Sequence, residues 1–264
     1  MIGEAFRGGI FHFLSDPKDG LTGCYEFFED GLLVVENGRI TQLGDAEPLV
    51  DELDISVRIH EYAGKIICPG FVDTHVHYPQ LAIIASYGES LLDWLECYAF
   101  DEEKKFDDAD HSLTTANHFL DELLRCGTTT AQVFGTVHPE SVEGFFTAAE
   151  HRDLRMICGK VLMDRNGPIG LLDTPETSYI DSKNLIDRWH GRGRLRYAVS
   201  PRFAPTSTPD QLATARQLLC EHPGIHLQTH LSEDKGEINW VKSLFPECKN
   251  YLDVYERAGL LGKR

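Results

Sequence analysis

The sequence has few basic residues for its length and no long apolar run. Its 25 lysines and arginines stand against 42 aspartates and glutamates, which gives a formal net charge of −17. A surface this acidic repels phosphate backbones and anionic lipids, so we expect neither nucleic acid nor a membrane as a partner. No stretch approaches the roughly 18 apolar residues that a membrane span requires, and the N-terminal residues lack the layout of a secretion signal.

Paired cysteines and nucleotide-binding loops are missing as well. The seven cysteines include no CxxC pair, which argues against a thiolate zinc site, and their odd number argues against a disulfide framework. Reduced thiols predict a cytoplasmic protein. The glycine-rich GxGxxG and P-loop patterns that hold nucleotide phosphates are also absent.

The residues that are present divide into two kinds of pattern near residue 65. Residues 1–65 carry short apolar stretches separated by Gly and Asn, including the hairpin signal ENGRI at 36–40. They predict a small β domain of the sandwich type. In residues 66–264, continuous apolar runs alternate with segments of helical spacing, which predicts parallel strands joined by helices.

Five strand–helix units can be recognised in this second part. The apolar runs end near residues 77, 135, 164, 205 and 233, and the segments of helical spacing cover 108–127, 140–151 and 208–224. The units repeat about every 40 residues, and an eightfold barrel needs three more of them. The sequence therefore predicts an α/β fold, a (β/α)8 TIM-like barrel of which about five units are present.

Two histidines stand at the end of the first buried strand. In ICPGFVDTHVHYPQ, residues 67–80, His75 and His77 are two positions apart, so in a strand they project from one face. Parallel barrels build their sites at this end of the strands, and two neutral imidazoles suit a divalent metal, zinc above all. With 12 histidines in the chain such a pair also arises by chance, and alone it favours a hydrogen-bonded loop.

A third histidine changes that balance. The stretch HLQTHLSE, residues 226–233, places His230 at the end of the fifth strand, on the same rim of the barrel. Glu233 follows three residues later, within reach of a metal-bound water. We interpret His226, one layer deeper on the same face, as a core or supporting residue. The acidic runs at 45–54 and 101–110 we interpret as solvated faces.

Six stretches of the chain carry a family resemblance. They are PGFVDTHVHYPQ, ESLLDWLECYAFDEEKKF, CGTTTA, GKVLMDRNGP, SPRFAPT and QTHLSED. Together they resemble the guanine deaminases of the metal-dependent amidohydrolase superfamily. The first stretch is shared across the superfamily, whereas LLDWLE…FDEEKKF and SPRFAPT are more specific. The resemblance extends from about residue 25 to residue 264.

The resemblance implies a metal site and a proton carrier. His75, His77 and His230 match ligands of one Zn²⁺ per subunit, with iron as the alternative metal. Glu233 matches the carboxylate that moves protons. Members with two metals bridge them with a lysine of the fourth strand, whereas Lys160 falls on the third strand, which favours a single metal.

The resemblance also implies a purine pocket. Gln80 matches a glutamine that contacts the base, and Arg202 and Phe203 match a pair that hydrogen-bonds and stacks on it. A guanidinium is a rigid set of donors, a phenyl face covers a flat heterocycle, and an amide offers both a donor and an acceptor. The implied activity is hydrolytic deamination of guanine to xanthine and ammonia by a zinc-activated water.

Two ligands of the family's metal site do not occur in this sequence. The family adds a histidine from the sixth strand and an aspartate from the eighth. We therefore expect the chain to be the N-terminal portion of an enzyme that is a homodimer when full length, with little activity from this portion alone. The alternatives are a related amidohydrolase acting on a triazine, cytosine or adenosine-type heterocycle, and a noncatalytic scaffold fragment.

Overall fold

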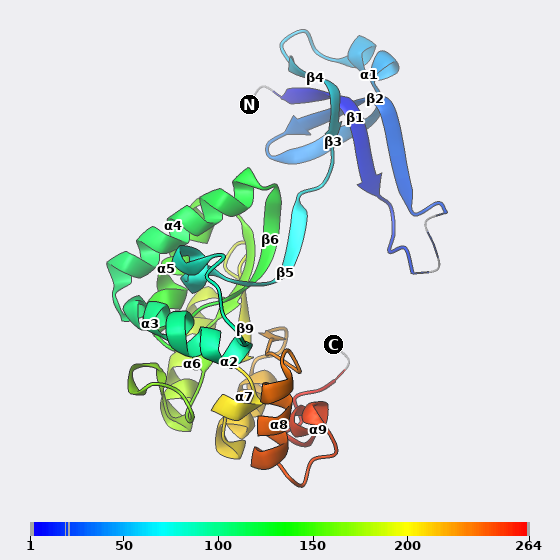
Figure 1. The fold of residues 1–264 in the computed structure, drawn as a ribbon. Coiled ribbons are helices and arrows are strands. Elements are labelled where there is room, and N and C mark those ends of the chain that lie inside the picture. The colour runs from blue at the N-terminus through cyan, green and yellow to red at the C-terminus, as the bar shows by residue number, and fades with distance from the viewer. Residues whose placement is uncertain (1–2, 19, 21, 263–264) are drawn as a thin grey trace. The chain divides into compact units, whose positions relative to one another are not determined.

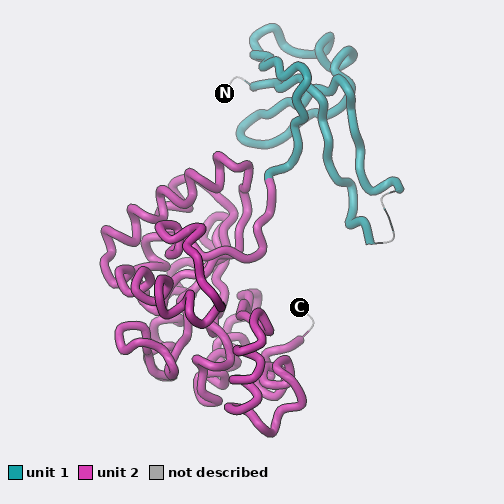
Figure 2. Tube along the Cα trace, viewed as in Figure 1, with its two compact units in different colours: residues 1–70 teal, residues 71–264 magenta. Residues whose placement is uncertain are grey.

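The computed structural model describes residues 3–18, 20 and 22–262, and the chain divides into two compact units, residues 1–70 and 71–264 (Figure 2). The boundary predicted from the sequence, between residues 65 and 66, falls inside strand β4 (Arg58–Ile67). That boundary stays a prediction. Each unit has its own hydrophobic core.

The first unit is a four-stranded sheet with one helix. Its elements are β1 (Glu4–Phe13), β2 (Tyr25–Glu36), β3 (Arg39–Asp45), α1 (Ala46–Glu52) and β4. The strand order is β3-β2-β1-β4, with β4 parallel to β1 and the other pairs antiparallel. Asn37 and Gly38, both with positive φ, form the predicted hairpin turn between β2 and β3. The sandwich predicted for this part of the chain is thus represented by one sheet in the described residues.

The second unit is a curled parallel sheet with helices packed along it (Figure 1). Its strands are β5 (Phe71–His77), β6 (Thr128–Phe134), β7 (Arg155–Gly159), β8 (Val161–Leu162), β9 (Arg196–Pro201) and β10 (His226–Leu227). The order is β10-β9-β7-β6-β5, β8 pairs with β9, and every pair is parallel. Because β7 and β8 continue one another across Lys160, they count as one strand, and the described sheet has five strand positions. The predicted α/β barrel with about five units is confirmed.

The helices of this unit follow the predicted alternation with strands. They are α2 (Leu91–Trp94), α3 (Phe100–Glu103), α4 (Ala109–Arg125), α5 (Pro139–His151), α6 (Pro175–Trp189), α7 (Pro209–Glu221), α8 (Lys235–Leu244) and α9 (Tyr251–Arg257). A π-helical turn, Leu95–Ala99, joins α2 to α3. None of the helices in the described part of the chain is long and apolar enough to cross a membrane.

Local signals explain where the longer helices begin and end. The Asp108 side chain accepts hydrogen bonds from the first backbone N–H groups of α4, and Thr208 does the same for α7. Gly127, with φ of 84°, follows the end of α4 and turns the chain into β6. Phe119 and Leu120 of α4 are buried in the main core, and each such side chain contributes about 1.5–3 kcal/mol by leaving water.

Lys160 belongs to a buried polar network between strand and helix. It lies at the junction of β7 and β8, on the third strand as the sequence predicts, and its ammonium pairs with Asp173. Ser178 and Gln211 also donate hydrogen bonds to Asp173. The buried ammonium and carboxylate neutralise each other, and these contacts connect the β7–β8 junction to α6 and α7.

Candidate active site

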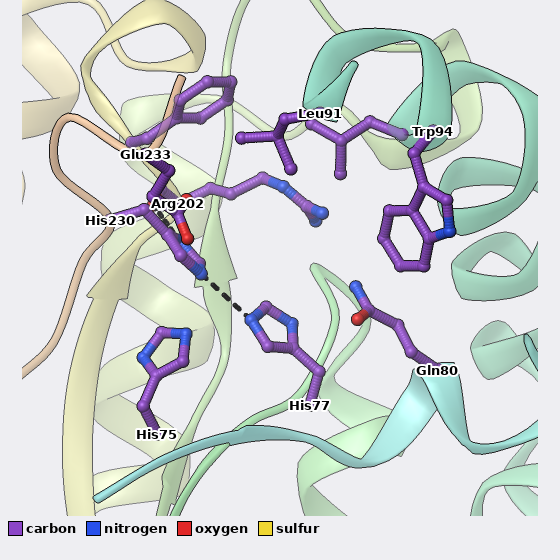
Figure 3. Close-up of a pocket in the computed structure, with 10 residues that line it drawn as sticks. His75, His77, Gln80, Leu91, Trp94, Arg202, His230 and Glu233 are labelled. Carbon is purple, nitrogen blue, oxygen red and sulfur yellow. Dashed lines mark hydrogen bonds between the residues drawn. The ribbon is translucent and has the colours of Figure 1, made fainter. Parts of the chain in front are cut away.

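Three histidines from distant parts of the chain meet at the carboxyl ends of the strands. His75 and His77 end β5, and His230 follows β10. The ligand nitrogens of the three all lie within 4.8 Å of one another. The Nε2 atoms of His77 and His230 are 2.9 Å apart, as the dashed line in Figure 3 marks. The structure thus brings together the three residues that the sequence singled out as metal ligands.

The surroundings of these imidazoles keep them neutral. Burial lowers the pKa of His75 and of His77, the latter to well below its usual value, and lowers the pKa of His230 to about 4. The Nδ1 atom of His230 lies 2.7 Å from the backbone oxygen of Arg202. Because a carbonyl can only accept, Nδ1 carries the hydrogen and Nε2 presents its lone pair to the cluster.

The donor set fits a divalent metal. Neutral imidazoles bind zinc and similar ions through one ring nitrogen each, and here three of them converge. The Nδ1 atom of His77 is buried without a hydrogen-bond partner, so this ring is arranged by packing and not by a second hydrogen bond. The backbone N–H of His75 donates to Asp73 at 3.0 Å, which fixes the strand end on which the cluster depends.

A phenylalanine that the sequence did not point to supports the three rings. Phe134, at the end of β6, is fully buried. Its ring stacks on His77 with centroids 4.6 Å apart and contacts His230 at 4.6 Å and His75 at 5.2 Å. A flat apolar side chain thus excludes water from one side of the histidines. Its position at a strand end, on the rim where His75 and His77 lie, is the signal that could have found it.

The predicted site residues line one cavity of about 180 Å³. The cavity is lined by His75, His77, Gln80, Leu91, Trp94, Leu95, Arg202, Phe203, His230 and Glu233. All seven residues predicted for metal, catalysis and substrate are among them. The others come from α2 and the π-helical turn that follows it, and Figure 3 shows Trp94 across the drawn residues from Glu233, with Leu91 between them in this view.

A buried glutamate, interpreted from the sequence as part of a solvated face, joins the two polar residues predicted to contact the substrate. The Gln80 amide donates to Oε1 of Glu103 at 3.0 Å, and the Arg202 guanidinium donates to both oxygens of Glu103 at 2.5 and 3.1 Å. Glu103 is 1% exposed. The interpretation of residues 101–110 as a solvated face is therefore wrong at Glu103, and also at Glu102, which is buried too.

A helical period could have shown that Glu103 points inward. Leu95, Ala99 and Phe106 are buried, and Glu103 lies four positions after Ala99 and three before Phe106, on the same stripe. The Arg202 side chain that it meets also stacks over Phe100, with the guanidinium carbon 5.3 Å from the ring centroid. The charged pair is therefore enclosed by apolar groups.

Glu233 has the properties of a proton carrier. It lines the cavity beside His230 and stays partly exposed to solvent, and Figure 3 shows its carboxylate directed toward the histidines. Burial, together with the nearby Glu237, raises the pKa of Glu233 above its ordinary value. A carboxyl group with a raised pKa exchanges protons more readily near neutral pH. The backbone N–H of Glu233 donates to Glu237 at 2.8 Å, which holds the loop in place.

Comparison with known proteins identifies the family. Residues 66–264 match the profile of the Amidohydrolase family. The chain is 50% identical to guanine deaminase of Escherichia coli (strain K12) over 98% of the chain and 60% of that protein. The structure of the Escherichia coli enzyme superposes with a TM-score of 0.93, at 48% identity over 98% of this chain and 61% of that one.

A second structural relative is guanine deaminase from C. acetobutylicum with bound guanine in its active site. It superposes with a TM-score of 0.87 at 28% identity, over 99% of this chain and 60% of that one. The chain thus spans about 60% of the length of the relatives that it matches. Because the family profile covers most of the chain and the fold agrees, this protein is a member of the amidohydrolase family.

Proposed function

We propose that this chain supplies the substrate pocket and three metal ligands of an enzyme that hydrolyses guanine to xanthine and ammonia. One observation carries the proposal: a single cavity is lined by three neutral imidazoles, a carboxyl group with a raised pKa, and an Arg–Gln–Phe set suited to a flat polar ring. The likeness to guanine deaminases over nearly the whole chain supports the choice of substrate.

For the metal we propose one Zn²⁺ per subunit, held by His75, His77 and His230. Zinc favours imidazole nitrogen, and its catalytic sites use three protein ligands with an open position. When bound, the ion supplies Lewis acidity that lowers the pKa of a water from 15.7 towards about 7. Iron is the alternative metal for the same donor set.

Glu233 moves the protons of the reaction. Water adds to C2 of guanine, and its proton passes to the Glu233 carboxylate, which delivers it to the adjacent ring nitrogen. The remaining proton of the added water, now on the C2 hydroxyl, passes to the exocyclic amine, the C2–N bond breaks, and the amine leaves as ammonia. One water is consumed, and xanthine carries the new oxygen at C2. A carboxyl group partly shielded from water suits both halves of this transfer.

Arg202, Gln80 and Phe203 hold the base. The guanidinium presents rigid donors to a ring carbonyl, and the amide of Gln80 faces the same space (Figure 3). Phe203 is buried beside Trp240, with ring centroids 6.3 Å apart, so its face is a firm surface for stacking. Orientation by these three groups brings C2 toward the histidines and Glu233.

For the whole protein we propose a cytoplasmic homodimer that acts on a small purine, with neither nucleic acid nor a membrane as a partner. The net charge of −17 supports the exclusion of anionic partners, and the odd number of cysteines supports the location. The dimer rests on the resemblance to the family.

Titration of the zinc-loaded chain with guanine tests the proposal. Quenching of Trp94, which lines the cavity, reports binding, and xanthine and ammonia are assayed in the same samples. We expect saturable quenching that is lost in Trp94→Phe and in Phe203→Ala. If guanine neither binds nor reacts when zinc is present, the proposed function is wrong.

A further inference from the structure

The carboxylate of Glu103 determines which way the Gln80 amide faces. A carboxylate accepts hydrogen bonds and cannot donate them, so the amino group of Gln80 must be the end that points at Glu103, at 3.0 Å. The carbonyl oxygen of Gln80 is then turned away from Glu103. The hydrogen-bonding partner therefore fixes which end of the amide is nitrogen and which is oxygen.

The same carboxylate also holds the Arg202 guanidinium. Two of its nitrogens donate hydrogen bonds to the Glu103 oxygens at 2.5 and 3.1 Å. Both side chains are nearly inaccessible to water. A paired geometry of this kind restricts the guanidinium to one plane. The remaining N–H groups of Arg202 are therefore presented from a fixed position beside an amide of fixed orientation.

We propose that Glu103 orients Gln80 and Arg202 so that the cavity presents an acceptor from Gln80 beside donors from Arg202, and that this arrangement selects purines with a cyclic amide edge. This inference rests on the proposed function and deepens it. A cyclic amide presents a ring N–H donor next to a C=O acceptor. That edge matches Gln80 as acceptor and Arg202 as donor. A cyclic amidine instead presents a ring nitrogen without hydrogen, which accepts, next to an amino group, which donates, so it matches neither residue.

The neighbouring Glu102 provides the contrast within the same helix. Both residues lie in α3 and both are buried. Glu102 pairs with Lys105 at 2.5 Å and does not line the cavity or bond to a residue that lines it in the described contacts. Burial and charge are thus common to the two glutamates, and the bonds to Gln80 and Arg202 distinguish Glu103.

Two purines that differ only in that edge test the proposal. Guanine and 2,6-diaminopurine share the ring and the 2-amino group, and they differ in the amide or amidine at N1 and C6. The dissociation constant of each is measured by Trp94 quenching after dialysis against a chelator, so that no turnover occurs. For the unmodified chain we expect guanine to bind at least about 10-fold more tightly, because two buried polar mismatches are avoided.

The Glu103→Gln variant should lose most of that preference. A neutral amide at position 103 can donate to Gln80 as well as accept from it, so both orientations of the Gln80 amide become available. We expect the affinity ratio to fall to about threefold or less, mainly through weaker guanine binding. Glu102→Gln, the matched control, should keep the ratio of the unmodified chain.

A second variant guards against misfolding of Glu103→Gln. Gln80→Met removes the acceptor and leaves the buried Arg202–Glu103 pair intact, and it should also lower the ratio by weakening guanine alone. An unchanged ratio in either folded variant overturns the inference while leaving the proposed function in place. Equal binding of guanine and 2,6-diaminopurine by the unmodified chain also overturns the inference alone. If the unmodified chain binds neither purine, the inference and the proposed function are both overturned.

Discussion

At the scale of the residue, single atoms connect the proposed metal ligands to the proposed substrate contacts. The backbone oxygen of Arg202 receives the Nδ1 hydrogen of His230, while the Arg202 side chain is bonded to Glu103. One residue therefore sets the tautomer of a proposed metal ligand and also lines the cavity. Groups of this kind orient ligands and strengthen metal sites without touching the ion.

Removal of His230 should abolish tight zinc binding. In His230→Ala the cluster is reduced to His75 and His77, and two imidazoles do not make a stable catalytic zinc site. We expect the metal content after gel filtration to fall from about one ion per chain to about one tenth or less, measured by mass spectrometry. His138→Ala, which removes a part-buried histidine outside the cavity, should retain the metal. Full zinc content in His230→Ala would contradict the assignment of the ligands.

Removal of Arg202 should destabilise the fold as well as the pocket. In Arg202→Ala the Glu103 carboxylate stays buried without its charged partner, and such a loss costs about 3–5 kcal/mol. The double variant Arg202→Met with Glu103→Leu removes both charges and should be more stable than Arg202→Ala. Urea unfolding followed by tryptophan fluorescence measures the difference. A double variant no more stable than the single one would show that the pairing is not the source of the effect.

At the scale of the element, helix α9 secures the loop that carries His230. The Tyr255 hydroxyl donates to the backbone oxygen of His230 at 2.9 Å, and it accepts from Ala204 N–H at 2.9 Å and from Thr229 at 3.0 Å. Burial raises the pKa of Tyr255 to about 12, so the hydroxyl keeps its hydrogen at all pH values at which the protein is handled. One helix thus fixes both the loop after β9 and the loop after β10.

The Tyr255→Phe variant should weaken zinc binding more than its loss of stability suggests. It leaves buried partners unsatisfied, at about 1–3 kcal/mol, and frees the His230 backbone, so we expect zinc affinity to fall about 10-fold. Tyr251→Phe removes a hydroxyl of the same helix that bonds Glu237 instead, and it should lose stability with unchanged zinc affinity. Competition with a chromophoric chelator measures both. Equal zinc affinities in the two variants would refute the role of Tyr255.

At the scale of the whole molecule, the histidine cluster joins the two ends of the second unit's sheet. The strand order places β10 and β5 at opposite ends, and His230 follows the first while His75 and His77 end the second. The sheet curls until these ends approach, as the twist of parallel strands in a barrel requires. A metal held at the cluster therefore links the first and last strands of the described sheet.

Zinc should accordingly stabilise residues 71–264 against heat. An ion that binds only the folded state adds about 2.7 kcal/mol at 100 times its dissociation constant. For a unit of this size that raises the midpoint of unfolding by roughly 5–10 °C, measured by calorimetry with and without chelator. The His230→Ala variant should show no such shift, and a shift of equal size in that variant would place the ion elsewhere.

Much of the fold could be predicted because its signals are local. The caps Asp108 and Thr208, the turn at Gly127 and the apolar stripe of α4 act on residues within a few positions, so the alternation of strand and helix can be read directly. The pairing of His75 with His77 is equally local, since the period of a strand places them on one face. The strand end at 226–233 likewise predicted the positions of His230 and Glu233, and the family resemblance supplied the expectation for Gln80, Arg202 and Phe203.

The sequence by itself thus determined the elements, their order and the residue types gathered at the strand ends. Only the tertiary structure decided that Glu103 faces Arg202, 99 positions away, and that Phe134 supports all three histidines. The stripe of Leu95, Ala99 and Phe106 could have shown that Glu103 points inward, but not which group it meets there. Whether a carboxylate meets water or a guanidinium depends on which distant segment packs over it, and no local spacing specifies that partner.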